Sequence, residues 1–230
     1  MNLEGYPREA VLKDGRRVTL RPMVGEDALK LKLLFIGLPE KERTFVRDCD
    51  IHPEMDVPWP EDHDYGRVLP ILALDGDQIV GIATLHRNSY SWNFHLGNIR
   101  ITVCPDYRRK GLGRILLGEI FRNTLGIGLD KVMVEIVKDQ IDISLFFNRL
   151  GFRTEASLSD HYLDEQGDKH DVIIMSNNLK QLWKLWVEHE SASNLKNKTA
   201  VRTERRRPRD RTNLLEDRKP QDTPKEVKGR

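Results

Sequence analysis

The chain has 230 residues, of which 38% are hydrophobic and 32% are charged. Its mean hydropathy of −0.57 is low for a chain that packs its whole length into one core. The formal charge of +2 hides an asymmetry, because residues 191–230 hold 13 Lys and Arg against 6 Asp and Glu. An acidic body of net charge −5 therefore precedes a basic tail of net charge +7.

Several classes of protein are excluded at this stage. No stretch approaches the roughly 18 apolar residues of a membrane span, and the first fifteen residues lack the apolar core of a signal peptide. Two cysteines, Cys49 and Cys104, cannot make a disulfide framework, so we expect a cytoplasmic protein. The sequence has no CxxC or HExxH pattern and its seven histidines are scattered, so we expect no metal.

Hydrophobic periodicity predicts strands and helices in the first half of the chain. We take residues 1–15 as a lead-in and 16–22 as a strand, followed by short helices over 26–37 and 40–48. Residues 49–66 are acidic and irregular. Two apolar runs around Asp75-Gly76-Asp77 then predict a β-hairpin.

The second half alternates between the two periodicities. The predicted elements are a strand over 93–103, a helix over 111–125, a strand over 131–137, a helix over 139–150, strands over 152–158 and 170–176, and a helix over 179–190. This order predicts one α/β domain of the α+β type over residues 16–190, with a mixed, mostly antiparallel central sheet flanked by helices. Residues 191–230 have the composition of a disordered tail.

The segment ITVCPDYRRKGLGRILLGEIF, from Ile101 to Phe121, is a strand, a basic glycine-containing turn and a helix. It lacks the GK[ST] end of a Walker A loop and the third glycine of a dinucleotide-binding fingerprint. Helix-start amides favour an anion, and Gly111 and Gly113 let a pyrophosphate approach the backbone. Four basic residues add charge: Arg108, Arg109, Lys110 and Arg114. The alternative is a tight turn with a solvated basic face.

The wider context of this R-x-x-G-x-G motif favours the first interpretation. The motif follows a strand ending in Val-x-Pro, and beyond it come a helix, a strand and a helix that closes with Leu150-Gly151-Phe152. This arrangement resembles the GNAT superfamily of N-acyltransferases, over roughly residues 16–178. The resemblance implies acetyl-coenzyme A as the donor, and attack by a primary amine in a ternary complex.

The resemblance also implies the residues that hold the donor. The pyrophosphate would lie on the loop Arg108, Arg109, Lys110, Gly111, Leu112, Gly113 and Arg114. The pantetheine arm would pair with Ile101, Thr102 and Val103, where the strand splays from its neighbour, and the Val103 N–H would polarise the thioester carbonyl. Two family positions depart from the usual pattern: Gln140 stands where Asn is common and Phe147 where Tyr often protonates the leaving thiolate.

The proton-transfer residues are open at this stage. Tyr162 and His161 are candidate acids, and Glu135, His95 and His86 are candidate bases. Each of them is equally consistent with an ordinary surface or hydrogen-bonded residue. Cys104 beside the thioester position suggests a covalent intermediate, but the resemblance implies direct attack.

The sequence indicates the acceptor and the partners only in general terms. Acidic residues gather in the segments expected to line the acceptor side: Asp48, Asp50, Glu54, Asp56, Glu61, Asp62, Asp64, Asp160, Asp164, Glu165 and Asp168. They favour a cationic amine, either a small molecule or a protein amino group, or they simply solvate loops. The apolar side of the last predicted helix consists of Leu182, Trp183 and Trp186. It would either cover the edge of the sheet or form a homodimer contact. Two other functions stay open: an acyl-CoA-binding module without turnover, and RNA or ribosome binding through the basic cluster at 203–211.

Overall fold

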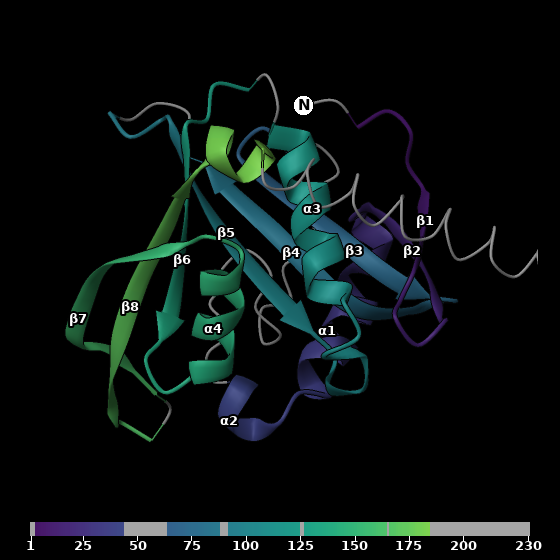
Figure 1. Ribbon diagram of the computed structural model, residues 1–230. Helices are drawn as coiled ribbons and strands as arrows, with labels where there is room; N and C mark the ends of the chain where they lie inside the picture. Colours follow the sequence, from purple (N-terminus) through teal and green to yellow (C-terminus); the bar gives the residue numbers. More distant parts are fainter. Residues whose placement is uncertain (1–2, 44–63, 88–91, 125–126, 165, 185–230) are drawn as a thin grey trace, which may run out of the picture. The chain divides into compact units, whose positions relative to one another are not determined.

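The computed structural model describes residues 3–43, 64–87, 92–124, 127–164 and 166–184. Its strands form one sheet in the order β1-β2-β3-β4-β5-β6-β8-β7 (Figure 1). The strands are β1 (Arg8–Val11), β2 (Arg17–Pro22), β3 (Val68–Asp75), β4 (Gln78–Arg87), β5 (Leu96–Val103), β6 (Lys131–Val137), β7 (Arg153–Leu163) and β8 (Lys169–Asn178). The helices are η1 (Gly25–Asp27), α1 (Ala28–Ile36), α2 (Glu40–Arg43), η2 (Pro105–Tyr107), α3 (Leu112–Thr124) and α4 (Ile141–Arg149).

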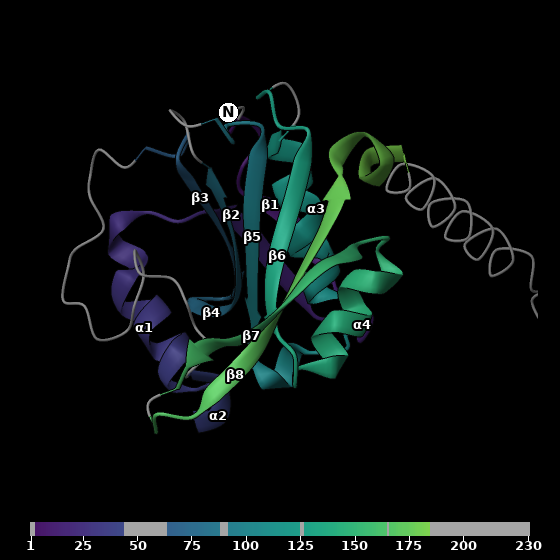
Figure 2. The ribbon, with the colours of Figure 1, turned by 90° about the vertical axis from the view of Figure 1, so that its left-hand side faces the viewer.

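The sheet is mixed because β5 and β6 are parallel, whereas the other neighbouring strands are antiparallel. Helix α1 covers one face, and α3 and α4 cover the other (Figure 2). The alternation of side chains along β3 divides the core accordingly: Leu69 and Ile71 pack toward α3, and Leu72 and Leu74 pack toward α1. The predicted fold class is therefore confirmed.

Most of the predicted elements are present with small shifts at their ends. The β3–β4 hairpin and the strand Lys131–Val137 are confirmed. Strand β7 is longer than predicted, because it continues to Leu163 through an irregularity between Leu158 and Tyr162. Residues 179–184 are helical, with Leu182 buried and Trp183 36% exposed. Residues 185–230, including the predicted tail, and the acidic segment 44–63 lie outside the described residues.

The start of the sheet differs from the expectation that residues 1–15 only lead into it. Residues Arg8–Val11 form β1 and pair with β2 from Arg8↔Leu20 to Val11↔Arg17. The strand is short and half-exposed, so it carries too little alternation to be recognised. Tyr6 just before it is bonded to Glu119 of α3, which fixes the segment against the helix layer.

The parallel pair β5–β6 is the feature that creates a site. Their pairing covers only Leu96↔Lys131, Gly97↔Val132 and Asn98↔Met133. Beyond Asn98, β5 stays paired with β4 as far as Val103, while β6 stays paired with β8 as far as Val137. The sheet therefore opens into a wedge between the carboxyl-terminal halves of β5 and β6, as Figure 1 shows.

Candidate functional site

The β5 side of the wedge presents backbone N–H groups that face no paired strand in the described part of the chain. The Cys104 N–H donates to the Val80 carbonyl of β4 at 2.9 Å. Because successive residues of a strand point their N–H groups to opposite sides, the N–H groups of Ile101 and Val103 point away from β4, into the wedge. In the described part of the chain, β6 pairs with β5 no further than Asn98. The expected splay at Ile101, Thr102 and Val103 is thus present, and these residues are partly exposed.

The loop from Arg108 to Gly111 turns the chain from β5 into α3. Arg109 has φ 59° and Gly111 has φ 92°, so two residues take left-handed conformations within one turn. Glycine tolerates such a φ without strain. The first α3 amide bonded back to the loop is that of Ile115, which donates to the Gly111 carbonyl at 3.1 Å. The amides of Leu112 and Gly113 precede it, as expected for an anion-binding helix start.

Gly113 lies where the loop, β5 and α4 meet. A Cβ built on Gly113 would lie 3.6 Å from the Phe146 ring and 4.0 Å from Val103. A methyl group would fit there, but a longer side chain would fill the space beside the helix start. The loop therefore presents backbone N–H groups next to the wedge, with no side chain at Gly113 to cover them. A pyrophosphate needs such close access to the backbone.

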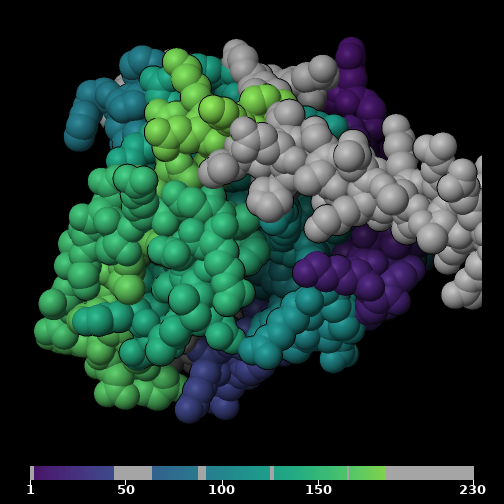
Figure 3. Space-filling model, viewed as in Figure 1, coloured from purple at the N-terminus to yellow at the C-terminus, as the bar shows by residue number. Residues whose placement is uncertain are grey.

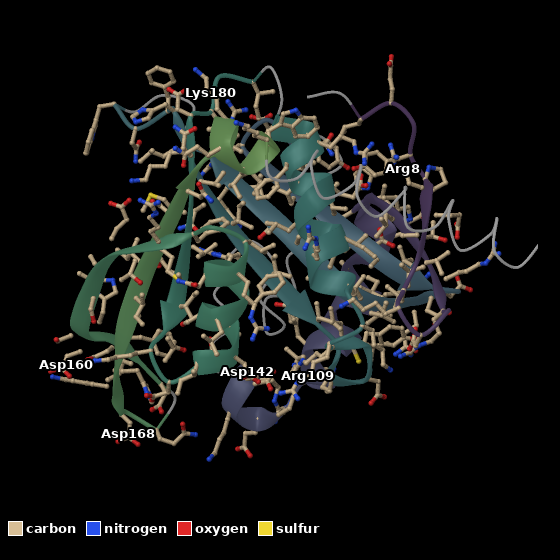
Figure 4. All side chains as sticks on the ribbon, viewed as in Figure 1. Arg8, Arg109, Asp142, Asp160, Asp168 and Lys180 are labelled. Atoms are coloured by element: carbon tan, nitrogen blue, oxygen red, sulfur yellow. The ribbon has the colours of Figure 1, made fainter. Side chains whose placement is uncertain are left out.

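The basic side chains of the loop are less free than the sequence suggests. Arg108 donates Nε to the Val103 carbonyl at 3.0 Å, and its two terminal nitrogens to the Glu42 carboxylate of α2. The guanidinium thus braces the end of β5 against α2. Arg109 forms an exposed ion pair with Asp142 at the start of α4, 2.9 Å apart, as Figure 4 shows.

The β1–β2 hairpin supports the loop from the other side, a contribution that the sequence analysis missed. The Lys13 N–H donates to the Lys110 carbonyl at 3.0 Å, and Lys110 Nζ lies 3.3 Å from Asp14 Oδ2. Arg16 donates to the Asp106 carbonyl at 2.8 Å. Figure 3 shows the purple hairpin against the teal loop. The Asp14-Gly15 turn signal between two basic residues could have indicated this hairpin.

Tyr107 completes this support beneath the loop. The Arg16 guanidinium stacks on its ring at 3.9 Å, and its hydroxyl donates to Asp75 of β3 at 2.6 Å. The bond to Asp75, together with burial, raises the pKa of Tyr107. The turn before the loop is therefore fixed to both the β1–β2 hairpin and the β3–β4 hairpin.

The α4 side of the wedge holds Gln140 and Phe147. Gln140 precedes α4, where its carbonyl accepts from Ile143 and Ser144 and its side chain is half-buried. Phe147 is 4% exposed and packs edge-to-face between Phe146 and Phe152, with ring centroids 5.1 Å apart in both pairs. Phe147 is therefore a core residue that offers no proton.

Polar residues line the wedge on the sheet face opposite α3. Val132, Val134 and Ile136 of β6 point into the α3 core, so Glu135 points to the other face, where it is exposed. Asn98 Nδ2 donates to Glu135 Oε1 at 3.2 Å. The register partner of Asn98 is His86, whose Nε2 lies 3.1 Å from Thr84 Oγ1. Glu135 and His86 are thus brought to the same face.

The other three candidates are not brought to the same place. His95 precedes β5, and eight residues of strand, about 26 Å, separate it from Val103. His95 therefore lies at the opposite end of β5 from Val103. Tyr162 lies on the β7–β8 hairpin opposite His170, with ring centroids 6.2 Å apart. His161, beside it, is exposed.

His170 is the centre of a small charged cluster at this hairpin. Its Nε2 donates to Asp164 at 2.9 Å, and its Nδ1 lies 3.7 Å from Asp139, which precedes α4. The bond from His170 lowers the pKa of Asp164, and the same bond raises the pKa of His170. Figure 4 shows Asp160 and Asp168 near the tip of the same hairpin.

The described residues contain no group of three His, Cys, Asp or Glu side chains that could hold a metal ion. None of their helices is long and apolar enough to cross a membrane.

Comparisons with known proteins identify the class. The model of the acetyltransferase (GNAT) family matches residues 39–152. None of the curated proteins compared with the chain matches it. The fold is similar to that of the GNAT domain of PAT from S. lividans, with 16% identity over 77% of this chain and 99% of that one, and a TM-score of 0.61.

Two similar structures contain the donor. They are yncA from Salmonella typhimurium with its cofactor acetyl-CoA (17% identity, 70% of this chain and 94% of that one, TM-score 0.56) and Arabidopsis thaliana NAA60 in complex with acetyl-CoA (17%, 71% and 99%, TM-score 0.53). Residues 39–152 thus match the acetyltransferase (GNAT) family, and the fold is that of GNAT structures. Such a fold supports acyl transfer from acetyl-CoA in general.

Proposed function

We propose that the protein is an N-acetyltransferase that moves an acetyl group from acetyl-CoA to a primary amine by direct attack in a ternary complex. The observation that carries this proposal is the opening of β5 from β6 directly before the loop 108–114. One structural unit then offers strand donors at Ile101 and Val103 and helix-start donors at Leu112 and Gly113. Gly113 keeps the junction open.

These residues fit coenzyme A in different ways. The amides and the exposed Arg109 would hold the pyrophosphate, with Lys110 and Arg114 adding charge. The N–H groups of Ile101 and Val103 would hold the pantetheine arm, and Gln140 and Phe147 would flank it. Arg108 would act by bracing Val103 and the loop, because its guanidinium is engaged with Glu42. Acetyl-CoA supplies an activated acyl group with a good leaving thiolate.

Glu135 is the base that the geometry favours, acting on the acceptor ammonium through water. His86 is the second candidate on that face. Tyr162 lies on the hairpin, so we assign it to the acceptor side and not to the thiolate. With Phe147 at the usual acid position, solvent would protonate the thiolate.

The acceptor side favours a cationic amine, a small molecule or a protein amino group. Asp139, Asp160, Asp164 and Asp168 surround the β7–β8 hairpin and would attract such a group. We place the reaction in the cytoplasm because the two cysteines suit a reducing compartment. A homodimer through the helix at 179–184 is a further expectation, since Trp183 is partly exposed there.

The binding test uses calorimetry with coenzyme A and the variant Gly111→Ala. A non-glycine residue at φ 92° costs about 1–2 kcal/mol. The loop would change conformation to relieve this strain, and its N–H groups would no longer be placed for the pyrophosphate. We expect affinity to fall about tenfold, in line with that cost. Gly128→Ala is the matched control, since it imposes similar strain (φ 78°) in another turn with open space around it. Failure of the unaltered protein to bind coenzyme A would refute the donor assignment.

The catalytic test measures thiol release from acetyl-CoA over a panel of polyamines, amino acids and basic peptides. Turnover with any of them supports the proposed acetyltransferase activity. The buried, hydroxyl-free Phe147 favours one competing function, an acyl-CoA-binding module without turnover. Tight binding of acetyl-CoA with no release across the panel would favour that module instead.

A further inference from the structure

The side chain of Lys13 lies on the loop that we propose as the pyrophosphate site. The three atoms nearest to a Cβ built on Gly111, outside its chain neighbours, would all belong to the Lys13 stem: Cγ and Cε at 3.7 Å and Cδ at 3.9 Å. The backbone holds the stem in this place, because the Lys13 N–H donates to the Lys110 carbonyl at 3.0 Å. The ammonium is one bond of about 1.5 Å beyond Cε. A cation of the β1–β2 hairpin therefore lies beside the turn into α3.

The charge of Lys13 is not used by the part of the chain that the structure describes. Lys13 is exposed, and the described residues give its ammonium no hydrogen bond or ion pair. The neighbouring carboxylate is engaged elsewhere, because Arg16 Nε lies 2.9 Å and Lys110 Nζ 3.3 Å from Asp14 Oδ2. The methylene stem could pack on Gly111 without any charge at its end. The ammonium is therefore free to pair with a ligand.

Two of the loop's own basic side chains are less available to a phosphate. Both terminal nitrogens of Arg108 donate to the Glu42 carboxylate. Lys110 Nζ donates to the Asp106 carbonyl at 2.5 Å. A phosphate that recruited either of them would have to replace these contacts. Lys13 can supply a positive charge beside the same loop without breaking any contact between described residues.

We propose that Lys13 binds the donor by pairing its ammonium with a phosphate group of coenzyme A. This role rests on the proposed acetyl transfer, because it takes the loop 108–114 as the donor site. Coenzyme A carries a pyrophosphate and a 3′-phosphate, and the point charge of a lysine on a flexible stem suits either group. Lys13 contributes to affinity for the donor and takes no part in the chemistry of transfer. The β1–β2 hairpin thus binds the donor as well as supporting the loop.

The first test is calorimetry with coenzyme A on the full chain and on Lys13→Met, which keeps an unbranched stem and removes the charge. We expect affinity to fall about fivefold at low ionic strength, the upper end of the range for an exposed ion pair. The difference should narrow at about 1 M salt, where charges are screened. Lys13→Arg keeps the charge and should bind nearly as well as the unaltered protein. Equal affinity of Lys13→Met and the unaltered protein at low salt overturns the proposal.

Arg17→Met is the matched control, because it removes one positive charge from the same hairpin. Val18 and Leu20 of β2 pack in the core beneath α3, so Arg17 points to the opposite face of the sheet. We expect Arg17→Met to bind coenzyme A with unchanged affinity. An effect as large as that of Lys13→Met would mean that the overall charge of the hairpin attracts the donor, and would overturn the contact with Lys13. Thermal unfolding of both variants, with unchanged melting temperatures expected, shows that the fold is intact.

The second test repeats the titrations with dephospho-coenzyme A, which lacks the 3′-phosphate. If Lys13→Met weakens the binding of both ligands, Lys13 pairs with the pyrophosphate. If it weakens the binding of coenzyme A alone, Lys13 pairs with the 3′-phosphate. Normal binding of both ligands by Lys13→Met refutes the role of Lys13 and leaves the proposed function standing. Failure of the unaltered protein to bind either ligand refutes the proposed function, and the role of Lys13 with it.

Discussion

Tyr6 shows how one side chain attaches the start of the chain to α3. Its hydroxyl donates to Glu119 Oε2 at 2.8 Å and accepts from Asn123 Nδ2 at 2.8 Å. Burial and the bond to Glu119 raise the pKa of Tyr6, so the hydroxyl stays protonated. Glu119 is itself buried, and Arg8 and Arg122 lie 3.7 and 3.6 Å from its carboxylate.

Removal of this hydroxyl tests the attachment. Tyr6→Phe leaves two buried polar groups short of a partner, so we expect the free energy of unfolding to fall by about 1–3 kcal/mol. Urea denaturation measures it. Thr19→Val is the control, because Thr19 bonds Glu9 in an exposed pair and its loss should cost under about 0.5 kcal/mol. Equal effects of the two variants would contradict the assignment.

His170 makes the stability of the β7–β8 hairpin depend on pH. Its pKa is raised in the folded protein, so its contribution to stability is fully present below the unfolded value of about 6.5 and is lost as pH rises through the folded value. We expect His170→Gln to be more destabilising at pH 6 than at pH 8.5, as measured by thermal unfolding. A pH-independent difference would contradict the pairing with Asp164.

At the scale of elements, the β1–β2 hairpin supports the loop that we propose as the donor site. It holds the loop through Lys13, Asp14 and Arg16. A chain that begins at Arg17 loses β1 and these contacts. We expect it to melt at a lower temperature and to bind coenzyme A more weakly, since the loop loses a support on one side.

Calorimetry with coenzyme A measures the loss of affinity separately from the loss of thermal stability. Asp14→Asn keeps β1 and weakens the half-exposed pairs that Asp14 forms with Lys110 and Arg16, so a smaller loss is expected from it. Full affinity in the shortened chain would show that the hairpin serves stability alone.

Elements with strong periodicity were predictable, and contacts across the sheet were not. The strand Lys131–Val137 alternates clearly, which placed Glu135 on the face opposite Val134. Its bond to Asn98 joins residues 37 positions apart and depends on the β5–β6 register, which no local pattern contains. The same is true of Arg108, whose partner Glu42 lies on a distant helix.

The position of His95 was unpredictable for a related reason. Its residue type suits a base, but a strand is rigid and extended, so its position at the start of β5 puts it far from Val103. β1 escaped prediction because four half-exposed residues carry little signal and their pairing with β2 decides their conformation.

At the scale of the whole molecule, the described residues all belong to one compact unit, Met1–Trp186. Every residue assigned to donor binding lies within it. We therefore expect a chain that ends at Trp186 to bind coenzyme A with unchanged affinity, measured by calorimetry beside the full chain. The basic tail, if it contacts RNA, should add only a salt-dependent affinity that the shortened chain lacks. Weaker coenzyme A binding by the shortened chain would give the tail a part in donor binding.

The wedge between β5 and β6 has a consequence for the protein without its donor. Beyond Asn98, β5 has an edge that faces the wedge. N–H groups at such an edge can pair with a strand of another chain. A bound pantetheine arm would occupy those groups and so act as a substitute strand. Under the proposed function, coenzyme A would then keep β5 from pairing with a strand of a second chain, in addition to carrying the acetyl group.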